Sequence, residues 1–409
     1  MREVELLAPA GGMESLIAAV QAGCDAVYLG GDAFGARAFA GNFDREQMAE
    51  AIRYAHRYGV RVYVTMNTLI YEDEMEAALA YARFLYEHDA DALLLQDIGL
   101  CDRIRQELPD FELHASTQMH IHNEAGMETA RRLGISRVVL PRESTIEEIR
   151  SLSGQGMEIE VFVHGALCVC YSGQCLMSAS LMGRSGNRGE CAQPCRWKYA
   201  LVEERRPGQY MEIGENEDGS YILNANDLCT APFIDLICQA GVDSLKIEGR
   251  AKTFYYVASV TSAYRRALDA YLANPNADPF ELPGDVIDEL NRTSHRHYSP
   301  GFYFGKEQAL QTPSHSYLRE WEFLGTVDSW ENGAARCTQR GKFSLGDTIE
   351  ALQPDGTTRT WAPAWLRDAD GLAIDSTPHP MMSYTMDCPE ALMPYSLLRK
   401  RSGGEEGGN

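Results

Sequence analysis

Five of the chain's 11 cysteines lie within the short segment Glu160–Arg196. The segment follows an apolar run at Ile159–Val163 and is rich in glycine. A strand that opens into a glycine-rich loop can fold tightly around a small group. Clustered thiols in a chain without secretory features favour metal binding over disulfides. We therefore predict that this segment is a metal-binding loop.

The spacing of the cysteines bears on which metal the loop would hold. Six residues separate Cys168 from Cys175, fifteen separate Cys175 from Cys191, and thirty-seven separate Cys191 from Cys229. Structural zinc sites usually show two tight cysteine pairs, and only Cys191 and Cys195 resemble one. Loosely spaced thiolates are compatible with an iron–sulfur cluster, which takes four cysteines. The spacing leaves a cluster, zinc and inert thiols open, with the cluster preferred.

The elements that would position this loop alternate between β-branched runs and helix-period stretches. The expected strands are Val4–Ala8, Ala26–Leu29, Val60–Thr65, Ala92–Leu95, Glu112–Ala115, Arg137–Leu140, Ile159–Val163 and Ser244–Ile247. The expected helices are Met13–Ala22, Arg45–Tyr58, Glu72–Glu87, Leu100–Glu107, Asn123–Leu133, Thr145–Ser153, Ala231–Ala240 and Phe254–Ala273. Eight such units in series predict an α/β fold, a (β/α)8 TIM-like barrel. A doubly wound sheet is the alternative, which the missing dinucleotide-binding fingerprint disfavours.

The predicted barrel covers residues 1–275, and the cysteine-rich insertion interrupts it at about 165–230, a length typical of functional insertions. Residues 276–320 are expected to form a linker with a basic and aromatic stretch, Arg292–Lys306. Short alternating runs between turns predict a small all-β barrel domain over 321–398. The glycine- and glutamate-rich end, 399–409, predicts a disordered tail.

Functional residues of such a barrel follow the carboxyl ends of its strands. The residues at those positions are Arg37, Asn67, Gln96, Asp97, Ser116, Gln118, Arg142, Glu143, His164, Lys246, Glu248 and Arg250. We assign the first six to substrate binding and the others to catalysis. The cations among them could converge on an anionic ligand, because guanidinium groups bind carboxylates through two hydrogen bonds. The alternative is that they form salt bridges with Glu143 and Glu248 that rigidify the barrel mouth.

The overall charge restricts the partners. A net charge of −22 argues against a protein that coats nucleic acid without specificity. Arg184–Arg206 is locally basic, so RNA would have to meet a local patch. Neither a signal peptide nor a window long and apolar enough to span a membrane occurs, so we expect a cytoplasmic protein without membrane contact. Homo-oligomerisation is left open.

Several ordered motifs carry a resemblance to a known family. They are LLAPAG at Leu6–Gly11, AVYLGG at Ala26–Gly31, YVTMNTL at Tyr63–Leu69, EVFVHGALCVCYSGQCLMS at Glu160–Ser178, GNRGECAQPCR at Gly186–Arg196 and LKIEGR at Leu245–Arg250. Together they closely resemble peptidase family U32, the collagenase-like peptidases. The C-terminal β domain is similar to the one that the tRNA-modifying branch of this family carries.

The resemblance implies a 4Fe–4S cluster on Cys168, Cys175, Cys191 and Cys229, while Cys195 matches a ligand of a related branch. It also implies oxygen-independent hydroxylation of wobble uridine in tRNA, with prephenate as the hydroxyl donor. Prephenate is a small dicarboxylate, which suits the cations at the predicted mouth. The RNA would dock on the β domain and on the basic stretches Arg184–Lys198 and Arg292–Phe304.

Two other functions remain open at this point. One is a peptidase of the U32 type, although neither a zinc-protease HExxH motif nor a GxSxG nucleophile elbow is present. The other is a non-enzymatic, cluster-bearing RNA-binding or assembly factor.

Overall fold

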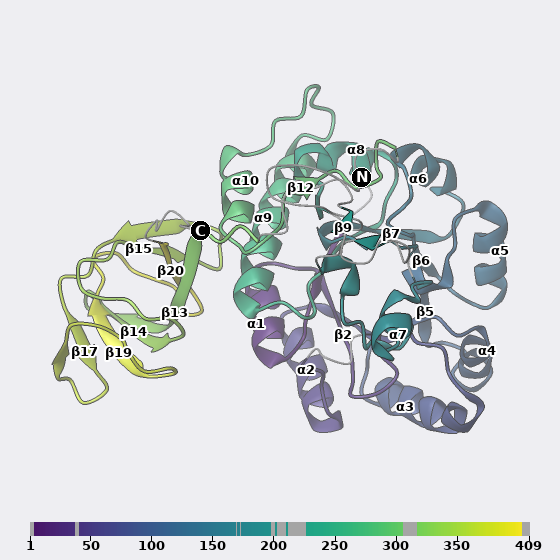
Figure 1. Ribbon diagram of the computed structural model, residues 1–409, viewed down its shortest axis with the longest axis horizontal. Coiled ribbons are helices and arrows are strands. Elements are labelled where there is room, and N and C mark those ends of the chain that lie inside the picture. The colour runs from purple at the N-terminus through teal and green to yellow at the C-terminus, as the bar shows by residue number, and fades with distance from the viewer. Residues whose placement is uncertain are drawn as a thin grey trace.

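Two bodies make up the structure, a computed structural model that describes residues 4–36, 41–168, 170–171, 173–197, 201–202, 210–211, 226–305 and 317–402 (Figure 1). The larger body is an α/β barrel. The smaller is an all-β domain that lies beside helices α1 (Met13–Gln21) and α9 (Phe254–Ala273). Arg37 lies outside the described residues. Within the described ranges, no helix has the length and apolar character needed to cross a membrane.

Eight parallel strands form the barrel wall. They are β1 (Glu5–Pro9), β2 (Ala26–Leu29), β3 (Arg61–Met66), β4 (Ala92–Leu95), β5 (Glu112–Ala115), β6 (Arg137–Val139), β7 (Glu158–Ala166) and β11 (Ser244–Ile247). Strand β11 pairs in parallel with both β7 and β1, which closes the ring. The TIM-like barrel predicted from the sequence is therefore confirmed.

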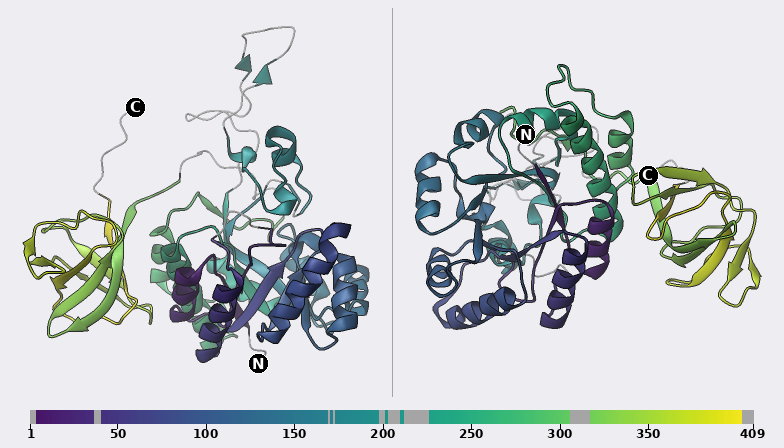
Figure 2. Two further views of the ribbon diagram at one scale, coloured as in Figure 1. Left: turned by 90° about the horizontal axis from the view of Figure 1, so that it is seen from below. Right: turned by 180° about the vertical axis from the view of Figure 1, so that it is seen from behind.

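Helices surround this wall on the outside (Figure 2, right). Besides α1 and α9 they include α2 (Arg45–Arg57), α3 (Met75–Glu87), α4 (Ile98–Glu107), α5 (Glu124–Arg132), α6 (Ile146–Leu152) and α8 (Ile234–Gln239). Asp44 and Thr145 form capping boxes that satisfy free backbone N–H groups at the starts of α2 and α6. Gly23 and Gly241 follow α1 and α8 with φ of +84° and +89°, a left-handed conformation that ends helices readily at glycine.

The insertion after β7 turns back on the barrel. Strand β10 (Asp227–Cys229) pairs antiparallel with the end of β7, and β12 (Tyr298–Ser299) pairs in parallel with β10. This pairing explains why β7 continues to Ala166, beyond the predicted end at Val163. The insertion also contains α7 (Met177–Met182) and the strand pair β8 (Leu201–Val202) and β9 (Tyr210–Met211).

The segment predicted as a linker with a basic and aromatic stretch, 276–320, contains a helix that the sequence did not predict. Helix α10 (Gly284–Asn291) packs on α9 with Val286 and Leu290 fully buried. Further on, the Arg296 guanidinium is buried and donates to the Asp227 carboxylate at 2.7 Å. An apolar helix face and a buried ion pair fix this segment to the barrel. It therefore offers less free basic surface for RNA than its composition indicates.

The C-terminal domain is one antiparallel sheet in the order β16-β15-β20-β13-β14-β19-β17-β18. Its strands are β13 (Trp321–Glu331), β14 (Ala334–Gln339), β15 (Ile349–Leu352), β16 (Thr358–Trp361), β17 (Leu366–Asp368), β18 (Ala373–Ile374), β19 (Ser383–Asp387) and β20 (Leu397–Arg401). Buried residues such as Leu324, Phe343 and Leu398 give it a core of its own. The prediction of a separate all-β domain is confirmed.

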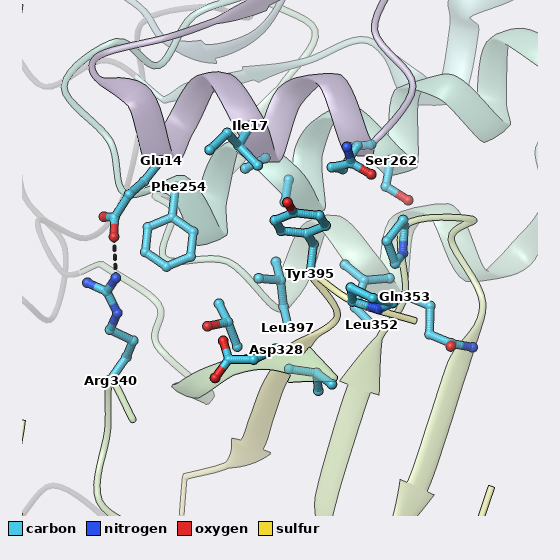
Figure 3. A pocket seen from close by; sticks show the side chains of 18 residues that line it. Glu14, Ile17, Phe254, Ser262, Asp328, Arg340, Leu352, Gln353, Tyr395 and Leu397 are labelled. Carbon is cyan, nitrogen blue, oxygen red and sulfur yellow. Dashed lines mark hydrogen bonds and ion pairs between the residues drawn. The ribbon is translucent and has the colours of Figure 1, made fainter. Parts of the chain in front are cut away.

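The tail predicted from residue 399 is wrong at its start, because β20 continues to Arg401. Arg399 is fully buried and binds Glu289 of α10 at 2.6 Å and Glu350 of β15 at 2.6 Å. This ion cluster joins the two bodies. Nearby, a cavity of about 380 Å³ separates α1 and α9 from the sheet, with Ile17, Phe254 and Leu397 among its apolar lining (Figure 3). None of the described candidate residues lines this cavity.

Candidate functional site

Charged side chains fill the barrel interior beneath the mouth. Arg137 of β6 donates to Glu5 of β1 at 2.6 Å and lies 3.4 Å from Glu160 of β7. Glu160 in turn accepts from the Lys246 ammonium at 2.6 Å. Burial lowers the pKa of Lys246, against the opposing effect of the Glu160 carboxylate. Each buried charge therefore has a partner of opposite sign, as low-dielectric burial requires.

The charged residues of β11 and of the ends of β6 and β11, which we call the cation side, are Arg142, Lys246, Glu248 and Arg250. The Arg142 guanidinium donates to Glu248 at 2.7 Å and covers the Phe162 ring at 3.7 Å. Arg250 donates to the Thr65 hydroxyl at 2.9 Å and to the Asn42 amide oxygen at 2.6 Å. The salt bridge considered from the sequence is thus present between Arg142 and Glu248. The structure thus brings Arg142 and Glu248 together, whereas the Arg250 guanidinium contacts strand β3 and the loop after β2.

The opposite side, the amide side, consists of Asn67, Gln96, Ser116 and Gln118 after strands β3, β4 and β5. The Asn67 amide donates to the Ser116 hydroxyl at 3.2 Å. The Gln96 amide donates to the Gln118 carbonyl at 3.4 Å. Asp97 differs from these residues, because its carboxylate accepts from Leu100 N at the start of α4 and from Ile70 N. Its contacts are those of a structural cap.

Two histidines beyond Gln118 extend the amide side, and the strand-end rule missed them. The rings of His120 and His122 lie 5.3 Å apart. Burial and the neighbouring His120 lower the pKa of His122, against the opposing charge of Glu143. Glu143 thus lies at the boundary between the two sides. Extending the search a few residues past each strand end would have found both histidines.

The cysteine-rich insertion covers this mouth. The Arg188 guanidinium donates to Glu74 at 2.6 Å and to the Leu69 carbonyl at 2.6 Å. A polar hollow of about 220 Å³ lies beside this contact, lined by Gly31, Asp32, Ala33, Phe34, Gly35, Asn42, Thr68, Glu74 and Arg188. The ion pair of Arg188 with Glu74 anchors the insertion over the β3 side of the barrel. Arg188 belongs to the Gly186–Arg196 motif that the sequence singled out. Its ion pair with Glu74 could not be predicted from residue spacing.

Several of the insertion's thiols are neighbours. Burial, a hydrogen bond with Cys175 and the nearby Cys168 and Cys195 thiols raise the pKa of Cys170 to about 11. Cys191 is exposed, and its sulfur accepts from Gln193 N at 3.3 Å. Thiol donors of this kind suit a soft metal. Within the described ranges, however, no group of three or more histidine, cysteine, aspartate or glutamate side chains has a metal-binding arrangement.

Cys229 and His164 lie together in a different, buried environment. They face each other across the β10–β7 pair. The Tyr264 hydroxyl lies 3.9 Å from the Cys229 sulfur and 3.4 Å from His164 Nδ1, and it donates to the Val163 carbonyl at 2.7 Å. Burial lowers the pKa of His164 to about 3 and raises that of Cys229 to about 11. Both groups are therefore uncharged near neutral pH in this environment.

The fold and the site define a closed α/β barrel with a thiol-bearing insertion over its mouth and an appended all-β domain. Residues 11–313 match Peptidase family U32, and residues 319–399 match the Peptidase family U32 C-terminal domain. The two matches together span both bodies. The chain therefore belongs to peptidase family U32.

Relatives with different names are similar to this chain in sequence. The chain is 34% identical to the tRNA hydroxylation protein P1 of Bacillus subtilis over 406 residues, which cover 98% of this chain and 95% of that protein. It is 39% identical over 270 residues to a 23S rRNA 5-hydroxycytidine synthase of Escherichia coli, covering 66% of this chain and 40% of the synthase. It is 33% identical over 374 residues to a collagenase of Porphyromonas gingivalis, covering 87% of each chain.

Proposed function

We propose that this protein hydroxylates RNA, and specifically that it converts the wobble uridine of tRNA to 5-hydroxyuridine without molecular oxygen. The observation that carries the proposal is the similarity to a tRNA hydroxylation protein over nearly the whole of both chains. The relative named as a 5-hydroxycytidine synthase supports pyrimidine hydroxylation in RNA as a wider capability of this barrel. The proposed tRNA substrate implies a cytoplasmic protein.

The proposed cofactor is a 4Fe–4S cluster held by Cys168, Cys175, Cys191 and Cys229. Cys195 is the alternative fourth ligand, and zinc is the alternative metal. Cys170 has Cys168, Cys175 and Cys195 as neighbours, which supports a soft-metal site in this insertion, whereas Cys229 lies apart beside Tyr264. A bound cluster would supply electron transfer or Lewis acidity, while the protein supplies the thiolates and the mouth beneath them.

The proposed hydroxyl donor is prephenate or a similar small dicarboxylate. The Arg142 guanidinium is held at the rim by one carboxylate, that of Glu248, which a donor carboxylate could replace. Two further cations belong to the same set, Lys246 bound to Glu160 inside the barrel and Arg250 bound to Thr65. A dicarboxylate would thus meet positive charge on the cation side of the mouth.

Peptidase activity is the second candidate, favoured by the similarity to the Porphyromonas gingivalis collagenase. Cys229 and His164 form a cysteine–histidine pair in the described part of the chain. A nucleophilic cysteine needs an adjacent base that accepts its proton. Burial keeps this histidine's pKa near 3 and the thiol's pKa near 11, so the pair is poorly suited to that role. The RNA-hydroxylase proposal is therefore the stronger one.

Deleting the gene and measuring tRNA nucleosides by mass spectrometry tests the function. We expect 5-hydroxyuridine to disappear and to return with the wild-type gene. Gelatin cleavage by the purified protein, with unchanged tRNA in the deletion strain, would support the peptidase instead. Unchanged tRNA in the deletion strain, with no gelatin cleavage by the purified protein, would support the non-enzymatic RNA-binding or assembly factor.

The cluster is tested by iron content after anaerobic purification. Cys175→Ala should lose the bound iron, because a four-thiolate site then lacks one ligand. Cys170→Ala is the matched control from the same loop and should retain it. Equal iron in both variants would contradict the ligand set.

A further inference from the structure

Buried acceptor and imidazole atoms on the amide side lack partners. Gln96 is 8% exposed, and its side-chain oxygen forms no hydrogen bond. The same holds for the side-chain oxygen of Gln118 and for Nε2 of His120. Most buried polar atoms in folded proteins are hydrogen-bonded, and leaving one unpaired destabilises the protein. Three such atoms on one rim indicate a place where a ligand completes the hydrogen bonding.

The unpaired groups are fixed in position by their surroundings. Strands β4 and β5 are neighbours in parallel register, so Gln96 and Gln118 follow adjacent strand ends. The Gln96 amide nitrogen is held by the Gln118 carbonyl, and the Ser116 hydroxyl accepts from Gln118 N at 3.3 Å. His120 has a φ of +62°, which is rare and strained for a residue other than glycine. Strain of this kind persists where the surroundings hold a residue in place.

An aromatic ring from the insertion lies against the same rim. Tyr171 is 55% exposed, and its ring centroid lies 5.9 Å from that of His120. The backbone at Gly173 is close to Gln118, since a Cβ added at Gly173 would lie 3.1 Å from the Gln118 side chain. The insertion therefore brings an accessible aromatic face to the unpaired amides.

This combination fits the chemistry of an unstacked pyrimidine base. A glutamine amide can accept from the N3–H of uracil while donating to the neighbouring carbonyl, and an imidazole N–H can donate to a carbonyl as well. Proteins commonly hold single-stranded bases on aromatic side chains. A carboxylate ligand carries no N–H group, so it would leave the amide oxygens unpaired. The amide side thus suits a pyrimidine base, whereas the cation side suits a carboxylate.

We propose that Gln96, Gln118 and His120 bind the Watson–Crick edge of the target pyrimidine, with Tyr171 against its face. This inference rests on the proposed RNA-hydroxylase function and adds the site that selects the base. The cation side is then free to bind the anionic donor. The two substrates would meet between the two sides of one barrel mouth.

A pair of RNA probes tests the inference in the anaerobically purified full chain. Both are anticodon stem-loop RNAs, one with uridine and one with 3-methyluridine at the wobble position. The wild-type protein should bind the uridine probe at least about tenfold more tightly, since methylation removes the N3–H donor. Gln118→Ala should lose this preference while its affinity for the methylated probe stays unchanged. Gln106→Ala, an exposed glutamine on α4, is the matched control and should keep the preference.

A second variant separates recognition from folding. Gln96→Met removes both the unpaired oxygen and the amide nitrogen that donates to the Gln118 carbonyl at 3.4 Å, so the midpoint of thermal unfolding should stay near the wild-type value while the preference for uridine falls. A merely structural glutamine would lose stability and keep the preference. If the wild-type protein binds and hydroxylates the uridine probe, but Gln118→Ala and Gln96→Met retain the preference, the base-binding site is wrong and the function stands. If the wild-type protein binds neither probe and forms no hydroxylated nucleoside, both proposals fail.

Discussion

The two sides of the barrel mouth differ in how their polar groups are satisfied. On the cation side, Arg142 is paired with Glu248 and Lys246 with Glu160, at 2.7 and 2.6 Å. On the amide side, the side-chain oxygens of Gln96 and Gln118 have no partner. Both of these cations bind a carboxylate of the protein, whereas the two amide oxygens form no hydrogen bond.

This difference separates two ways of preparing a binding site. A buried cation cannot be left unpaired without a large desolvation penalty, so the protein supplies a carboxylate that a ligand can replace. A neutral amide can remain unpaired at a cost of about 1–3 kcal/mol. A charged residue that binds a ligand is therefore already paired with a protein carboxylate in the free protein, as a purely structural residue would be. Mutations on the two sides should consequently differ in their effect on stability.

The largest effect is expected at Glu160, which pairs with both Arg137 and Lys246 inside the barrel. Glu160→Ala leaves two buried cations without this carboxylate, so it should lower the free energy of unfolding by about 3–5 kcal/mol. Glu158→Ala is the matched control, because Glu158 also binds Arg137, at 2.7 Å, but is 45% exposed. Its loss should lower the free energy by about 1 kcal/mol or less. Equal losses in urea-induced unfolding would show that burial of the ion network is not what distinguishes the cation side.

A smaller effect, on donor binding rather than stability, is expected at Arg142. Arg142→Ala removes a charge-assisted partner for the donor carboxylate, so KM for prephenate should rise roughly ten- to hundred-fold. Glu248→Gln removes the competing carboxylate and should leave KM unchanged or lower it. Steady-state hydroxylation of tRNA at varied prephenate concentration measures both. A rise in KM for Glu248→Gln similar to that for Arg142→Ala would mean that the ion pair itself is what matters.

Much of the fold was predictable because local signals agree with the barrel. The bounds of β2, β4, β5 and β11 follow directly from short apolar runs between polar loops and glycines. The segment around α10 was not predictable in the same way, because its proline- and aspartate-rich approach resembles a linker. The apolar face of α10 is buried only by packing against α9, a contact that local sequence does not reveal.

The positions of the candidate residues could be predicted from the sequence, but their hydrogen-bond and salt-bridge partners could not. Gln96, Gln118 and Arg142 lie just beyond the carboxyl ends of β4, β5 and β6, as the strand pattern predicts. The same rule cannot identify Glu160, because that residue lies in the middle of β7 and faces its partners only after the barrel closes. It also placed His164 at the mouth, whereas pairing of β10 with the end of β7 buries it. Partner choice between distant strands is a property of the closed fold.

The smallest effect on stability is expected at Asp97. This residue also tests where the amide side ends, because it lies next to Gln96 but is assigned a structural role. It follows β4 directly after Gln96, yet its carboxylate oxygens accept from Leu100 N at 2.9 Å and Ile70 N at 3.2 Å. Asp97→Ala removes this helix cap and should lower the free energy of unfolding by about 1 kcal/mol. Asp97→Asn, the control, retains a capping oxygen and should stay near the wild-type value. Neither variant should alter the preference for uridine over 3-methyluridine. A loss of that preference in both variants at unchanged stability would assign Asp97 to base recognition and move the boundary of the site by one residue.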